Sequence, residues 1–334
     1  MIRRNFLILL LCACCIGGEP LFGANSNFSE MYQQEGELDD FPFENGSVCA
    51  VNTPQSCDNE GDWDPDVSCC SNLVWVPEAA PLFRPFVADP RQLTFSVGWR
   101  FNDRLFNRNT APVSFDNHFA FFRYYNPFGK LGVLQFEIEA GVWALFEHTT
   151  HAASLDNADY YVGLPLIFWQ GPWKYRLRLW HASSHLGDEF MVLNPDIRRR
   201  NPSLEAIDFF ISYEPSWHFR IYGGAGIILR NDPDFNCKRI FAEYGMEVRI
   251  GQWNTFYKRS QMWGRPYGGV HFRSREDCNF KLDATFVLGY EWTKICGLQR
   301  RIRIFGEYHT GCSVEGQFCH LTTDYYAIRV SYGY

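Results

Sequence analysis

Apolar and polar residues alternate one by one along most of the chain from residue 93 onward. In Leu93–Phe101 the odd-numbered residues are apolar, and the even-numbered ones are Thr, Ser, Gly and Arg. A period of two gives a β-strand one apolar and one polar face. About 12 segments of roughly ten residues show this pattern, which is typical of an outer-membrane β-barrel. They lie near residues 93–101, 116–125, 132–146, 159–169, 173–184, 206–214, 217–229, 239–250, 266–274, 280–292, 301–311 and 324–334.

The same alternation also fits a soluble β-sandwich. The lengths of the connections between segments help to distinguish the barrel from the sandwich. Tyr125–Gly132, Trp169–Trp173 and Glu214–Trp217 predict tight turns. Longer connections alternate with them, around 102–115, 147–158, 185–205 and 230–238. Outer-membrane barrels have short periplasmic turns and longer outer loops. The stretch 251–265 departs from this rule.

Aromatic residues give further support for a barrel. Trp169, Trp173 and Trp217 lie at the expected tight turns, as in the aromatic girdle of a membrane interface. The chain ends on Tyr334, and outer-membrane barrels commonly end on an aromatic residue that their assembly machinery recognises. We therefore predict an all-β fold: a closed antiparallel transmembrane β-barrel of about 12 strands with an irregular N-terminal periplasmic segment.

Composition excludes several other classes. The one continuous apolar run, residues 6–16, is shorter than the about 20 residues that a membrane-spanning helix needs. Aromatic residues make up 17% of the chain, which excludes a disordered protein. The net charge of −7 gives no basic surface for nucleic acid.

The N-terminal part differs from the rest. Arg3 and Arg4 precede the apolar run, which predicts a secretory signal peptide over residues 1–24. The sequence before Cys14 also resembles a bacterial lipobox, so a lipidated Cys14 is the alternative to a plain signal. Residues 25–90 form an acidic, Cys-containing segment, interpreted as a periplasmic segment or plug, or else as a solvated linker. Residues 91–334 are the expected barrel, in the outer membrane of a Gram-negative cell.

Nine of the 12 cysteines lie outside the signal region. Outside the cytoplasm cysteines normally pair, and the odd number leaves one free or joined to another envelope protein. Cys312 and Cys319 share one expected outer loop, so we predict that they pair. Cys237 with Cys278 is a second predicted pair, across neighbouring outer loops.

The polar faces of the expected strands carry charges of both signs. Asp208 is expected on the strand next to Arg176 and Arg178. In a barrel this face points inward, so we expect paired charges that fill the interior rather than a wide pore.

One strand breaks the apolar face. In the segment 173–184, His181 and Ser183 continue the stripe of Tyr175, Leu177 and Leu179 that should face lipid. Polar groups in lipid are costly and often functional. At about 3.3 Å per residue and a tilt near 45°, Ser183 lies roughly 19 Å above Tyr175. In an apolar band about 25 Å tall, that is the boundary of the outer leaflet, where the ester bonds of lipids lie.

The tripeptide His181-Ala182-Ser183 and this placement resemble two enzyme families. Outer-membrane phospholipase A and the lipid A deacylase both carry His-x-Ser on the outer wall of a barrel. The resemblance implies a nucleophilic Ser183, His181 as its base, and a third group that orients the histidine. That group is Asn in the phospholipase and Glu in the deacylase, on the next strand. Glu205 opens the next segment here, facing outward near the same depth, although the intervening loop is longer.

A third resemblance covers more of the chain. The motifs Ala88-Asp89-Pro90-Arg91, 183–189 (SSHLGDE) and 201–205 (NPSLE) resemble an uncharacterised bacterial outer-membrane family, known only as a domain of unknown function. The resemblance implies a location and no reaction.

Two functions therefore remain open. The first is a serine acyl hydrolase that acts on phospholipid or lipid A, in which Asp188 and Glu189 hold Ca²⁺ near lipid phosphates. In the second, the barrel is a narrow channel or a structural envelope protein joined to partners by disulfides. His181 and Ser183 are then interfacial residues that begin the loop, and Asp188 and Glu189 are simply solvated.

Overall fold

The computed structural model describes residues 72–77, 80–129, 131–147, 153–197, 200, 202–233, 235, 237–251, 262–294 and 300–334. All of them belong to one compact unit, Ser47–Tyr334. The predicted signal peptide, Cys14, most of the acidic segment and most of the irregular stretch 251–265 lie outside the described residues. The division of the chain at residues 24 and 90 stays a prediction.

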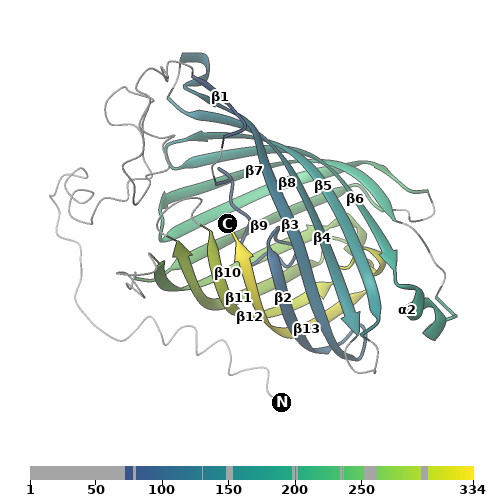
Figure 1. Cartoon of the computed structure of the whole chain (residues 1–334). Coiled ribbons are helices and arrows are strands. Elements are labelled where there is room, and N and C mark those ends of the chain that lie inside the picture. The colour runs from purple at the N-terminus through teal and green to yellow at the C-terminus, as the bar shows by residue number, and fades with distance from the viewer. Residues whose placement is uncertain are drawn as a thin grey trace, which may run out of the picture. The chain divides into compact units, whose positions relative to one another are not determined.

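The described chain consists almost entirely of antiparallel strands (Figure 1). The strands are β1 Leu73–Trp75, β2 Phe95–Asp103, β3 Arg108–Tyr125, β4 Val133–Glu147, β5 Leu155–Gln170, β6 Trp173–Leu186, β7 Ser203–Ser216, β8 Phe219–Asn231, β9 Ile240–Arg249, β10 Met262–Arg275, β11 Leu282–Lys294, β12 Arg301–Cys312 and β13 Thr322–Gly333. Four short helices lie in connections: η2 Pro127–Gly129, α2 Asp188–Leu193, η3 Glu276–Cys278 and η4 Gly316–Phe318. No helix in the described part of the chain is long and apolar enough to cross a membrane.

Strands β2 to β13 form a closed ring. Each strand pairs with its sequence neighbours, and β13 pairs with β2, with Tyr332 opposite Phe95. The short β1 pairs with the C-terminal end of β3, where Leu73 lies opposite Tyr124. It adds no further strand to the ring. Closure leaves no open sheet edge, which a barrel in lipid requires. The predicted closed barrel of about 12 strands, with its last strand paired to its first, is confirmed.

The two faces of the barrel wall differ as the alternation predicts. Large apolar side chains are exposed on the outer face, among them Phe95, Val97, Phe115, Leu164, Leu177, Leu179, Leu288, Ile304, Ile328 and Val330. Exposed apolar side chains on so many neighbouring strands suit contact with lipid. Charged side chains are buried on the inner face, among them Arg100, Glu137, Arg176, Asp208, Arg220, Glu247, Glu291 and Arg303.

One predicted connection is wrong. The expected long connection at 102–115 is only residues 104–107, because β3 begins at Arg108. Asn102 and Asn107 adopt left-handed backbone conformations, with φ of 49° and 52°, which Asn tolerates and which reverse the chain tightly. Thr110 and Ser114 are buried on the inner face.

The inward charges are paired, as predicted. Arg178 Nη2 lies 2.6 Å from Asp208 Oδ2. Glu291 is shared by several guanidinium groups, with Arg249 Nε at 3.1 Å and Arg303 Nε at 3.4 Å. Buried charges require such partners, since an isolated charge in the interior is very costly.

Residues 80–93, the lumen segment, run through the interior of the barrel. Arg220 donates hydrogen bonds to the carbonyl oxygens of Arg84 and Pro85, at 3.1 and 3.4 Å. Glu247 accepts the Val87 N–H at 3.0 Å. The Phe86 ring stacks on Tyr222 with centroids 3.7 Å apart. The lumen segment is thereby held against the charged inner wall.

Candidate functional site

The pairing of β6 with β7 determines the geometry of the predicted site. His181 lies directly opposite Glu205 in this pair. Both side chains are on the outer wall, with 40% and 37% of their surfaces exposed. Glu205 Oε1 lies 3.2 Å from His181 Nδ1, within hydrogen-bonding distance. A residue close to the start of β7 is thereby joined to the outward histidine of β6.

Ser183 is two residues further along β6, on the same side of the strand as His181, and lies opposite Ser203 in the last pair between β6 and β7. No hydrogen bond joins Ser183 to His181 among the residues that the structure describes. In enzymes without bound substrate such bonds are often long and tighten only when substrate binds. The assignment of His181, Ser183 and Glu205 as catalytic stays a prediction.

The ring nitrogen that Glu205 contacts matters for the chemistry. In a serine hydrolase the acid binds the Nδ1–H of the histidine, which leaves Nε2 as the base for the serine hydroxyl. Glu205 lies at Nδ1, so Nε2 remains available for Ser183 on the same strand face. This arrangement can activate a serine.

Tyr160 on β5 is a neighbour that the sequence did not single out. It lies opposite Ser183 in the pair between β5 and β6. Its side chain is exposed on the outer wall, and its ring centroid is 5.7 Å from that of His185. A phenol at this place can donate a hydrogen bond to an oxyanion. No local motif indicates it, because only the register between strands brings it beside Ser183.

Asp188 and Glu189 form the first turn of α2, and both are exposed. Neither belongs to a group of three converging carboxylate, histidine or cysteine ligands in the described part of the chain. A role for them in holding Ca²⁺ stays a prediction.

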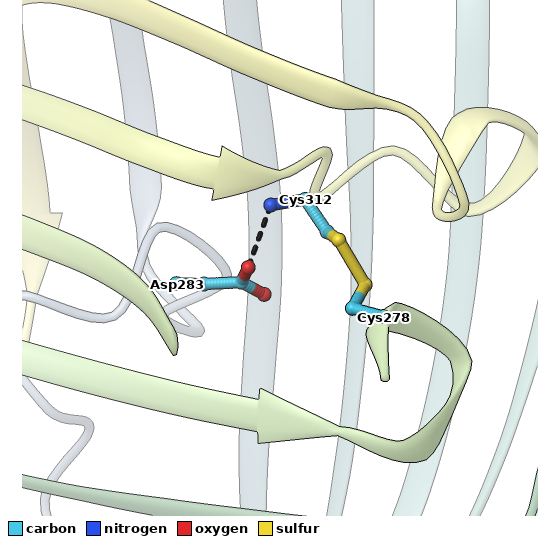
Figure 2. A group of neighbouring side chains, drawn as sticks. All are labelled: Cys278, Asp283 and Cys312. Atoms are coloured by element: carbon cyan, nitrogen blue, oxygen red, sulfur yellow. Dashed lines mark hydrogen bonds between the residues drawn. A yellow bond between two sulfur atoms is a disulfide. The ribbon is translucent and has the colours of Figure 1, made fainter. Parts of the chain in front are cut away.

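The cysteines pair differently from the prediction. Cys278 forms a disulfide with Cys312, with Cα atoms 6.6 Å apart, so both predicted pairs are wrong (Figure 2). Asp283 accepts the backbone N–H of Cys312 at 2.6 Å beside this bond. Cys319 follows η4, which turns it toward Cys237, and both are buried as free thiols in one apolar cluster. Because the sulfurs of Cys278 and Cys312 are bonded to each other, they are not thiolate ligands, and the group that they form with Asp283 is not a metal site.

The inner side of the wall carries two other features. A cavity of about 230 Å³ is lined by aromatic and charged side chains, including Arg91, Trp143, Arg178 and Trp180. Beside it, ligand atoms of Asp89, Glu243 and His271 converge to within 4.8 Å of one another. Apart from the disulfide group, this is the one set of three metal-ligand types that the described residues bring together.

The closed ring of strands and its apolar outer face define an outer-membrane-type β-barrel. The chain belongs to the family described as "Protein of unknown function (DUF1207)", whose profile matches residues 49–334. This confirms the family resemblance seen in the sequence motifs. No curated protein matches the chain.

Several solved barrels are similar in fold. The β-domain of the Bordetella autotransporter BrkA is 12% identical, with a TM-score of 0.40, over 72% of this chain and 96% of that chain. The NanC porin is 10% identical, with a TM-score of 0.35, over 72% of this chain and all of that chain. LpxR from Salmonella typhimurium is 10% identical, with a TM-score of 0.36, over the same shares.

Proposed function

We propose that this barrel lies in the outer membrane of a Gram-negative bacterium and hydrolyses acyl esters of lipid at its outer wall. Phospholipid and lipid A are the substrate classes. The single observation that carries the proposal is the contact of Glu205 with Nδ1 of His181, on the wall that faces lipid. The apolar outer face supports the location.

The chemistry follows from this arrangement. His181 Nε2 takes the proton of the Ser183 hydroxyl while Oγ attacks the ester carbonyl carbon, and Glu205 stabilises the imidazolium. The tetrahedral intermediate then expels the lipid alkoxide, which receives the proton from His181. Water activated by His181 releases the fatty acid from Ser183. Ca²⁺ held at Asp188 and Glu189 would bind lipid phosphates beside this site.

The test is fatty-acid release by the purified barrel in mixed micelles of phospholipid or lipid A, with and without Ca²⁺. Ser183→Ala and His181→Ala should abolish release without affecting folding, whereas Glu205→Ala should retain some activity, since the orienting residue is often the least costly to lose. Ser203→Ala is the matched control, because this serine lies directly opposite Ser183. The proposal fails if the wild-type barrel releases no fatty acid, or if Ser183→Ala releases it normally.

The second candidate is a non-enzymatic barrel, either a narrow channel or a structural envelope protein. The contacts of the lumen segment with the inner wall and the paired inward charges favour it. Conductance measured in planar bilayers distinguishes the channel from the structural form. Non-reducing gels of whole envelopes would reveal disulfide-linked partners. The assembly machinery that reads a C-terminal aromatic residue is an expected partner of either form.

A further inference from the structure

A cluster of three metal-ligand side chains lies inside the barrel, apart from the outward site. Asp89 comes from the lumen segment, Glu243 from β9 and His271 from β10. One ligand atom of each lies within 4.8 Å of the others. The cluster therefore brings together three parts of the chain that are far apart in sequence.

His271 is held so that one nitrogen points into the cluster. Its side chain is only 3% exposed, and its Nδ1 forms a hydrogen bond of 3.0 Å with the Tyr222 hydroxyl. Its Nε2 lies 3.7 Å from Glu243 Oε2, beyond hydrogen-bonding distance. Histidines that ligate metals are commonly oriented in this way, by a hydrogen bond at the other ring nitrogen.

The two arginines that act electrostatically on Glu243, Arg178 and Arg273, form their ion pairs with other carboxylates. Arg178 pairs with Asp208 at 2.6 Å, and Arg273 lies 3.4 Å from Asp283. Among the described residues, neither Asp89 nor Glu243 has a lysine or arginine nitrogen within 4.0 Å. Two neighbouring carboxylates repel each other, and a bound cation would neutralise both.

One carboxylate oxygen of Asp89 can act as a metal ligand. Its Oδ1 accepts the backbone N–H of Arg91 at 2.8 Å, which fixes the orientation of the carboxylate. Its other oxygen makes no hydrogen bond among the described residues. Both Asp89 and Glu243 also line the cavity of about 230 Å³, which has room for water.

We propose that Asp89, Glu243 and His271 bind a divalent transition-metal cation of the Zn²⁺ class. Two carboxylate oxygens and one imidazole nitrogen form a three-ligand set that leaves a fourth position open, and the adjoining cavity can supply its water. The imidazole argues against Ca²⁺ and Mg²⁺, which prefer all-oxygen sites. The cation would anchor the lumen segment to the wall formed by β9 and β10.

The experiment uses the full-length barrel in detergent, stripped with EDTA and then titrated with Zn²⁺ by calorimetry. One Zn²⁺ per chain is expected. The double variant Asp89→Asn/Glu243→Gln should weaken binding by on the order of 100-fold or more, since it removes both charged ligands. Tyr222→Phe keeps the ring that stacks on Phe86 but loses the hydrogen bond, and a loss of about tenfold is expected.

Controls separate this site from other metal-binding groups. Asp324→Asn removes an exposed carboxylate and should leave Zn²⁺ affinity unchanged. Co²⁺ bound by carboxylate and imidazole gives weak visible bands without the strong near-ultraviolet absorption of a thiolate ligand. Heat-modifiable gel migration identifies variants that have folded.

Three outcomes would overturn the proposal: no Zn²⁺ binding by the wild-type barrel, unchanged binding by the folded double variant, or a thiolate signature with Co²⁺. Fatty-acid release is measured separately, because it depends on the contact between His181 and Glu205, which are not part of the metal cluster. Either proposal can therefore fail without the other.

Discussion

Replacing Glu315 by Gln should destabilise the barrel strongly at neutral pH. Glu315 lies in the connection between β12 and β13, and its Oε1 is 2.8 Å from Arg100 Nη1, with both side chains almost completely buried. Burial alone would raise the pKa of Glu315, but the Arg100 guanidinium outweighs this effect and lowers the pKa to about 2. A fall from an ordinary 4.5 to about 2 corresponds to ~3 kcal/mol of folding free energy.

The variant keeps the size of the side chain but leaves Arg100 with Asp103 alone, at 3.4 Å. Removing one partner of a buried ion pair typically costs about 3–5 kcal/mol, in agreement with the value from the pKa. Because the pKa is lowered in the folded state, the stabilisation is complete above pH 4.5 and is lost as the pH falls to about 2. The difference between wild type and Glu315→Gln should therefore disappear at about pH 2.

Urea unfolding of the barrel in lipid vesicles, followed by tryptophan fluorescence, measures the effect. Asp324→Asn is the matched control, because Asp324 pairs with Arg104 at 3.3 Å while 43% and 73% of the two side chains are exposed. An exposed pair contributes about 0–1 kcal/mol, so the control should unfold almost like wild type. A loss below about 1 kcal/mol in Glu315→Gln, or a loss that persists at low pH, would refute the reasoning.

Three further predictions concern the cysteines and the lumen segment. Peptide mapping without reduction should recover Cys278 linked to Cys312, and recovery of Cys312 linked to Cys319 would contradict the loop arrangement. A hydrogen bond from Cys237 lowers the pKa of the Cys319 thiol. Its thiolate should therefore attack oxidised glutathione at a lower pH than an ordinary thiol does, and the mixed disulfide should then be displaced by Cys237, and two thiols that stay unreacted would contradict this. Phe86→Ala should cost about 3 kcal/mol in urea unfolding, because it leaves a hole beside Tyr222, and no measurable cost would mean that the segment is loosely held.

The strands could be predicted because their signal is local. A period of two is visible within a single segment such as Phe280–Trp292, and the structure has β11 at Leu282–Lys294. The start of β3 could not be predicted because Arg108–Phe115 contains Asn, Pro and Ser, which favour loops and turns. The inward side chains of this part of β3, such as Thr110 and Ser114, become buried only when the ring of strands closes. The sequence of one segment does not show that closure.

The sites were less predictable, because they depend on register and on long-range contacts. The alternation of side chains along β6 predicts that His181 points outward. Its partner, Glu205, depends on the register of β7, which a long connection sets. The disulfide was missed because η3 and η4 turn the chain at the ends of their loops. Asp89 belongs to a motif that indicates only the family, and no local pattern joins it to His271.

One substitution, Glu205→Gln, tests whether the contact between His181 and Glu205 serves catalysis. About two-fifths of each side chain is exposed, and the pair lies near the end of the strand pairing, where polar groups cost little. An exposed pair of this kind adds about 0–1 kcal/mol to stability, so Glu205→Gln should unfold almost like wild type. If the pair orients a base, the same substitution should lower fatty-acid release by much more than its effect on stability explains, because an amide cannot stabilise an imidazolium as a carboxylate does. Measuring unfolding and fatty-acid release on this one variant therefore separates a catalytic histidine from an interfacial one. If His181 is only interfacial, Glu205→Gln should change neither the free energy of unfolding nor the release of fatty acid.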